Sequence, residues 1–168
     1  MDHELSSPPV LLDTLPELGR YWRFRYALLL AIPGGALLLL HLLLSLRRSA
    51  VDRPVLLGIG LAVLALGVLL GWWYGARRHA LYRAELREQE GVVLYDGVWW
   101  RSEVWVPMAR LQHLDVSQGP LDRRWAMASL SLHTAGTHDH HTRIDGLPQA
   151  LAHSLRERLL PRHRGEHE

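Results

Sequence analysis

Histidine side chains gather in one short segment in the last third of the chain. His138, His140 and His141 surround Asp139, and His133 lies shortly before them. Imidazole nitrogens and carboxylate oxygens are ligands that zinc and nickel accept. The same polar composition is typical of a solvated turn between two strands. We expect the solvated turn and no cofactor, and metal binding by these histidines is the alternative.

A second polar cluster, Arg123, Arg124 and Trp125, combines two guanidinium groups with an indole ring on an expected loop. Arginine binds phosphate groups through several parallel hydrogen bonds, and tryptophan favours the boundary between lipid and water. The cluster therefore suits an anionic lipid headgroup or a bilayer interface. The alternative is an ordinary solvated loop whose tryptophan folds back onto the core.

Other chemistry finds little support in the sequence. We identify no glycine-flanked serine, phosphate-binding loop, dinucleotide motif or paired-histidine zinc helix. The chain has no cysteine, which excludes disulfides and thiol catalysis. Its formal net charge is only +2, and the basic residues are spread along the chain. We therefore expect a protein that is not an enzyme and has no nucleic-acid partner.

Two long apolar runs dominate the first half of the chain, at residues 26–46 and 55–76. Each is about the length that crosses the hydrocarbon core of a bilayer as a helix. The stretch between them is short and charged, so the two helices are predicted to form an antiparallel hairpin. The bilayer is thus the first expected partner.

The positions of arginine predict which way the hairpin faces. Cytoplasmic flanks of membrane helices carry an excess of positive charge. Arginines near the outer ends of the two runs outnumber those in the connecting stretch, so we expect both termini in the cytoplasm, with inversion as the alternative. Interfacial aromatic residues are expected at the same edge: Trp22, Trp72, Trp73 and Tyr74.

Small residues recur every four positions on both runs, as in closely packed membrane helices. Folding the hairpin about Val51 places the two stripes level with one another. The expected pairs are Ala27 with Gly75, Ala31 with Gly71, and Gly35 with Gly67. We predict a packing seam, while two alternatives stay open. The small residues could be incidental, or the glycine stripe could dock a partner helix.

Short alternating runs with turn signals follow the hairpin and predict an all-β domain. Asp96 and Gly97 form a hairpin dipeptide. Expected strands cover residues 80–87, 92–95, 98–100, 104–106, 111–117, 128–134 and 142–144. An amphipathic helix follows, with Pro148 in its first turn and an apolar stripe made of Leu147, Leu151, Leu155 and Leu159.

The stretch GVWWRSEVWVPMARLQHLDVSQGPLDRRWAMASLSLHTAG, residues 97–136, resembles the signature of bacterial pleckstrin-homology-like (PH-like) membrane-flanked domains, in particular of small members with two membrane helices. The resemblance implies an all-β PH-like barrel capped by the C-terminal helix. The matching motif residues are Gly97, Pro107, Arg110, Gln112, Gly119, Pro120, Arg123, Thr134 and Gly136. Ala126 departs from the pattern where relatives usually have glycine, so we expect a less sharp turn there.

The expected organisation has four parts. They are a cytoplasmic N-terminal tail (1–25), a membrane hairpin (26–76), a cytoplasmic PH-like domain (77–162) and a polar tail (163–168). We expect a binding or scaffold protein of the bacterial cytoplasmic membrane that acts through protein contacts. The resemblance implies a binding partner in the membrane, either other copies of the chain or a larger multi-span relative with PH-like domains. A lipid-sensing module using Arg123, Arg124 and Trp125 is the alternative.

Overall fold

The computed structural model describes residues 9–46, 53–87, 90–134 and 141–159. The chain divides into two compact units. Residues 19–46 and 53–80 form a helical unit, whereas the described residues up to Leu18 and from Leu81 onward form a β-rich domain. The domain is therefore built from both ends of the sequence, and residues 10–18, which sequence analysis assigned to a tail, belong to it.

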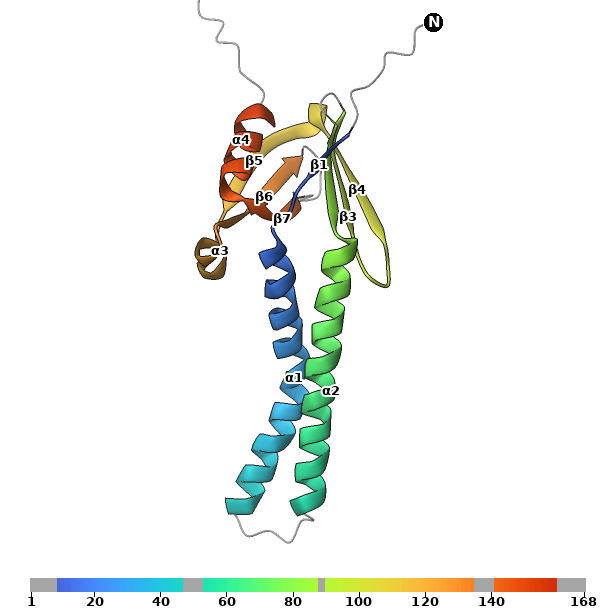
Figure 1. Ribbon diagram of the computed structural model, residues 1–168, viewed down its shortest axis with the longest axis vertical. Helices are drawn as coiled ribbons and strands as arrows, with labels where there is room; N and C mark the ends of the chain where they lie inside the picture. Colours follow the sequence, from blue (N-terminus) through green and yellow to red (C-terminus); the bar gives the residue numbers. More distant parts are fainter. Residues whose placement is uncertain (1–8, 47–52, 88–89, 135–140, 160–168) are drawn as a thin grey trace, which may run out of the picture. The chain divides into compact units, whose positions relative to one another are not determined.

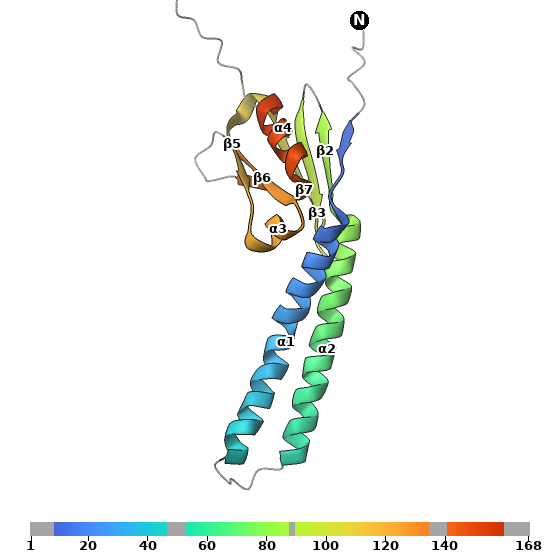
Figure 2. The ribbon, with the colours of Figure 1, turned by 60° about the vertical axis from the view of Figure 1, so that its left-hand side comes forward.

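The helical unit consists of α1 (Pro16–Leu46) and α2 (Arg53–Leu81), which run antiparallel and side by side (Figures 1 and 2). Both are long and apolar enough to cross a membrane. This confirms the two apolar helices expected from the sequence. Each helix continues beyond its apolar run at the end that joins the domain, where arginine and aromatic residues continue the helix.

Glycines of α2 lie directly on the backbone of α1. A β-carbon at Gly75 would meet the main chain of Trp22 and Arg23 at 2.6–2.7 Å. Added β-carbons at Gly67 and Gly71 would collide with the backbone of α1 in the same way. Small residues thus allow the two helices to approach closely, as is typical of membrane helix pairs.

The register of this seam differs from the expected one by one helical turn. Gly71 faces Ala27, and Gly67 faces Ala31. Gly35, expected opposite Gly67, has open space around it, whereas its neighbour Gly34 is in contact with the backbone of Leu64. The shift preserves the facing surfaces, because residues four positions apart lie on the same side of a helix.

Aromatic and basic side chains pack together where α1 begins and α2 ends. The guanidinium of Arg78 lies 4.4 Å from the ring centre of Trp22 and also donates a hydrogen bond to the hydroxyl of Tyr26. Tyr26 in turn meets Tyr74 edge to face at 4.8 Å. These contacts join the two helices through cation–π and aromatic interactions.

The described strands of the domain form two antiparallel sheets (Figure 1). The first has the order β1-β2-β3-β4 and the second the order β5-β6-β7. The elements are β1 (Val10–Leu12), β2 (Arg83–Arg87), β3 (Gly91–Asp96), β4 (Ser102–Pro107), the short 3-10 helix η1 (Met108–Arg110), β5 (Leu111–Ser117), α3 (Pro120–Arg124), β6 (Met127–Thr134), β7 (His141–Pro148) and α4 (Gln149–Leu159).

Helix α4 lies against β5, β6 and β7 (Figure 2). Its buried stripe is Ala152, Leu155 and Leu159, at the helical spacing that places residues on one face. The strands contribute a core of branched apolar side chains, including Leu86, Val92, Leu114, Leu130, Leu132 and Ile144. The all-β domain and its C-terminal helix agree with the sequence expectation, and the described strands form two antiparallel sheets.

Five local expectations need correction. Residues 98–100 form no strand and instead belong to a turn. Strand β1 and helix α3 were not expected. The last helix begins at Gln149, so Pro148, expected in its first turn, and Leu147, expected in its apolar stripe, belong to β7 instead. Residues 80 and 81 end α2 instead of beginning a strand.

Candidate functional site

Both long helices join the domain at the same end of its first sheet. Strand β2 starts at Arg83, directly after α2, and Leu12 of β1 pairs with Ala84. On the other side of β2, Tyr95 of β3 pairs with Arg83. We call this edge of the domain, where Leu12, Arg83 and Tyr95 lie, the helix-attachment end.

The connection between β3 and β4 projects from this end. Gly97 opens it with a φ of +112°, a conformation that favours glycine. The side chain of Asp96 accepts a hydrogen bond from the Gly97 amide at 2.7 Å, and the Ser102 hydroxyl donates to the Asp96 carbonyl at 3.1 Å. The turn therefore has a defined conformation.

Two tryptophans occupy the tip of this turn. Trp99 is 70% exposed and Trp100 is 87% exposed. Sequence reasoning placed them in a strand, because aromatic residues are common in strands. The Asp96–Gly97 dipeptide, expected to form a two-residue hairpin turn, instead begins a longer connection that ends where β4 starts at Ser102.

A cavity of about 480 Å³ opens at the base of the same hairpin. Its lining includes Arg83, Arg101, Glu85, Glu103 and Tyr95. Partial desolvation, followed by the charges of Glu103 and Glu85, raises the pKa of the Tyr95 hydroxyl, which stays protonated at neutral pH. Because both signs of charge line the cavity, its electrostatics do not select an anion.

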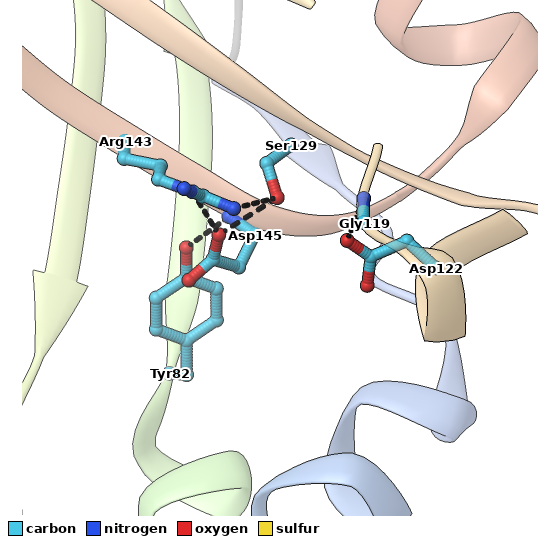
Figure 3. Close-up of polar contacts among 6 residues, drawn as sticks. All are labelled: Tyr82, Gly119, Asp122, Ser129, Arg143 and Asp145. Atoms are coloured by element: carbon cyan, nitrogen blue, oxygen red, sulfur yellow. Dashed lines mark hydrogen bonds and ion pairs between the residues drawn. The ribbon is translucent and has the colours of Figure 1, made fainter. Parts of the chain in front are cut away.

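Helix α3 presents the predicted arginine and tryptophan cluster. Gly119 and Pro120 begin the helix, and the Gly119 amide donates to the Asp122 carboxylate at 2.8 Å (Figure 3). Arg123 and Arg124 are exposed, and Trp125 is half-buried. The structure thus brings the three residues together, with the indole neither fully exposed nor fully folded onto the core.

Trp125 also lies at the helix-attachment end. It lines a cavity of about 740 Å³ together with Leu15 and Glu17, where α1 begins. The Leu15 amide donates to the Gly146 carbonyl at 2.7 Å, which ties this segment to β7. The β3–β4 tip and the α3 cluster therefore occupy the same end of the domain.

Ala126 adopts a φ of +51°, the one positive value for a residue other than glycine within the described ranges. The turn expected to be less sharp therefore keeps a left-handed conformation. That conformation costs a residue with a β-carbon about 1–2 kcal/mol. The usual glycine of relatives at this position has a physical explanation, since glycine lacks the β-carbon.

Replacing Ala126 with glycine is expected to stabilise the domain by about 1 kcal/mol, because relief of strain exceeds the entropy lost by glycine. Urea unfolding of the domain, followed by near-ultraviolet circular dichroism, measures this gain. Ala150→Gly, in the exposed first turn of α4, is the control and should destabilise. Loss of stability in Ala126→Gly would contradict the strain.

A polar network joins the two sheets (Figure 3). The Tyr82 hydroxyl, just before β2, accepts a hydrogen bond from the Asp145 amide of β7 at 2.8 Å. The Asp145 carboxylate accepts from the Ser129 hydroxyl at 2.8 Å and from Arg143 Nε at 2.7 Å. Arg143 also donates to Ser129 at 3.0 Å. Because these polar groups are hydrogen-bonded to one another, we assign the network a structural role.

The structure describes only part of the histidine segment in which metal binding was the alternative to a solvated turn. His138 and His140 lie outside the described residues, and His141 begins β7. The Asp115 carboxylate lies 3.1 Å from Nε2 of His113 and 3.3 Å from Nε2 of His133, and His133 stacks on His141 at 5.9 Å. Within the described ranges, no group of three or more histidine, aspartate or glutamate side chains is arranged to hold a metal ion.

The remaining motif residues support the turns and strand ends. Pro107 ends β4 opposite Gly91, and Thr134 ends β6 opposite Leu111. Arg110 lies in η1, and Gln112 is exposed on β5. Gly136 lies outside the described residues. The glutamine that bonds a backbone carbonyl is Gln118, which donates to Met127 at 2.8 Å.

Two apolar helices joined to a two-sheet domain with a terminal helix define a β-domain on an apolar anchor. A model of the bacterial PH domain family matches residues 27–163, which include both helices. The chain therefore belongs to the bacterial PH domain family, as the resemblance in residues 97–136 predicted.

One relative supports the anchor as a membrane hairpin. The chain is 40% identical over 60 residues to the UPF0699 transmembrane protein YdbS of Bacillus subtilis (strain 168). The match covers 36% of this chain and spans 37% of the length of that protein. No solved structure matches the chain.

Proposed function

We propose that this protein is a membrane-anchored, non-enzymatic scaffold that binds other proteins through the open edge of strand β4. The partner is a second copy of the chain or a larger membrane relative with PH-type domains. The hairpin fixes the domain at the cytoplasmic face of the bacterial membrane, and the two sheets with α4 act as a PH-like barrel. Anchoring raises the local concentration of partners, so modest contacts suffice.

The edge of β4 carries the proposal. Strand β4 pairs with β3 on one side, and within the described residues no strand pairs with its other side. Ser102, Glu103, Val104 and Trp105 are all exposed. An exposed edge with apolar side chains offers hydrogen-bonding groups and contact area to a strand of another chain.

The glycine seam supports the assignment of protein contacts to the domain and not to the helices. Gly67, Gly71 and Gly75 face α1 within the hairpin. Their small surfaces are used inside one chain, so the glycine stripe is not available to dock a separate helix. Protein contacts of the scaffold are therefore assigned to the domain.

Photo-crosslinking in intact membranes tests the β4 edge. A benzophenone amino acid at Val104 is expected to give a discrete crosslinked species, either a dimer of the chain or an adduct with a relative containing PH-type domains. The same group at Glu157, exposed on α4, is the matched control and should give none. Recovery of monomer alone from Val104, or the same products from both positions, would refute the proposal.

An anionic-lipid sensor is the second candidate, favoured by the exposed Arg123 and Arg124 beside Trp125 at the helix-attachment end. Guanidinium groups close to the bilayer would be attracted to anionic headgroups. Because β1 pairs with β2, a fragment that starts at residue 77 would lack part of its sheet. Lipid binding is therefore best studied in the full chain.

A further inference from the structure

We infer that the tip of the β3–β4 hairpin, Trp99 and Trp100, inserts into the lipid–water interface of the membrane that holds α1 and α2. The tip would give the domain a contact with the bilayer in addition to its two covalent connections. This inference does not rest on the scaffold proposal, because it concerns lipid and a different group of side chains.

The exposure of these side chains motivates the inference. Trp99 and Trp100 are adjacent and are 70% and 87% exposed. Tryptophan is usually well buried in folded proteins, and neighbouring exposed indoles mark a surface that something covers. An indole has an apolar body and one N–H donor, and such side chains concentrate at the boundary of a bilayer.

The sheet register places the tip at the end of the domain closest to the membrane along the chain. Tyr95 pairs with Arg83, and Asp96 pairs with Ser102. Residues 97–101 therefore extend beyond the strand end that receives α2. The opposite turn, which contains Glu90, lies at the far end of the same strands, where Arg87 pairs with Gly91.

Chain lengths allow the tip to reach the interface. Residues 77–82 separate the apolar run from β2, and at 1.5 Å per helical residue they cover about 9 Å. The tip lies four residues past Tyr95, and a chain of four residues covers at most about 13 Å. The headgroup layer adds roughly 5–7 Å on each side of the hydrocarbon core. The short connection therefore keeps the strand end that follows α2 within reach of the headgroup layer.

Charge and conformation favour lipid as the occupant. Arg101 follows the tryptophans directly and is exposed, so one guanidinium beside the indoles can approach an anionic headgroup. At the same end, Leu121 of α3 is 49% exposed beside Arg123 and Arg124. The hydrogen bonds of Asp96 hold the turn in place, so insertion requires little ordering of the loop.

Spin labels on the full chain can locate the tip. The chain has no cysteine, so a nitroxide can be attached to Val98→Cys, next to the intact tryptophans, or to Glu90→Cys at the far end. Each protein is placed at one copy per nanodisc of phosphatidylcholine with a minority of phosphatidylglycerol. Collision rates with oxygen, which concentrates in lipid, and with a water-soluble nickel chelate report depth.

The ratio of oxygen to nickel collisions at Val98→Cys is expected to exceed that at Glu90→Cys several-fold. Adding Trp99→Ser and Trp100→Ser should bring the Val98→Cys ratio to the Glu90→Cys value. The line shape of the Glu90→Cys label should stay unchanged in the double-serine background, which shows that β2 and β3 remain folded. A water-exposed label at Val98→Cys, or a ratio unaffected by the serines, would overturn the inference.

Discussion

Replacing Gly71 by leucine is expected to separate α1 from α2 and to destabilise the hairpin by about 3 kcal/mol. A β-carbon at this position collides with the backbone of Tyr26 and Ala27. Backbone cannot move aside as a flexible side chain can, so the helices must shift apart along the seam. Overpacking of this kind usually costs 1–3 kcal/mol, and the backbone contact places it near the upper limit.

Detergent unfolding measures the effect. The chain in dodecyl maltoside is titrated with dodecyl sulfate, and near-ultraviolet circular dichroism follows the aromatic cluster of Trp22, Tyr26 and Tyr74. Gly58→Leu is the matched control, because a β-carbon at Gly58, on the same helix, meets nothing within 4 Å. Equal unfolding midpoints for the two variants would contradict the seam.

The hairpin shows what helix periodicity can and cannot predict. Four-residue spacing identifies Gly67, Gly71 and Gly75 as one face, because side chains four apart share a side of the helix. The partner residues depend on where the chain turns back. In the structure Gly71 faces Ala27 and not Ala31, so each glycine of α2 faces a residue of α1 four positions earlier than expected.

In the domain too, some elements can be predicted from the sequence and others cannot. Alternating leucines in residues 128–134 predict β6, and Leu130 and Leu132 are buried as expected, but Ser129 is buried as well. Strand β1 has only three residues and gains its partner, β2, from across the helical hairpin. Local patterns cannot reveal such a distant pairing. The sequence therefore predicts the long elements of this domain better than its short ones.

The candidate site residues lie on a short helix and in a turn, whose conformations are harder to predict from sequence than those of long helices and strands. Sequence reasoning identified Arg123, Arg124 and Trp125 by composition, and the structure places them together on α3. It missed the exposure of Trp99 and Trp100, because a two-residue turn at Asp96 and Gly97 puts both tryptophans in the next strand. Exposure, which distinguishes a core tryptophan from an interfacial one, is a property of the folded chain.

The two-span hairpin is expected to hold the domain at the cytoplasmic face of the membrane. Arginines flanking the outer ends of the helices favour this orientation. A charged domain cannot equilibrate across the hydrocarbon core, since exposing polar backbone to lipid costs several kcal/mol per group. Labelling from the two sides of the membrane should therefore give all-or-none results.

Single-cysteine labelling with a membrane-impermeant maleimide tests this claim most directly. Glu90→Cys, in the domain, and Ser49→Cys, between the helices, are compared in spheroplasts and in inside-out vesicles. We predict that Glu90→Cys reacts only in inside-out vesicles and Ser49→Cys only in spheroplasts. Reaction of both cysteines from the same side, or of Glu90→Cys from the outside, would contradict the account.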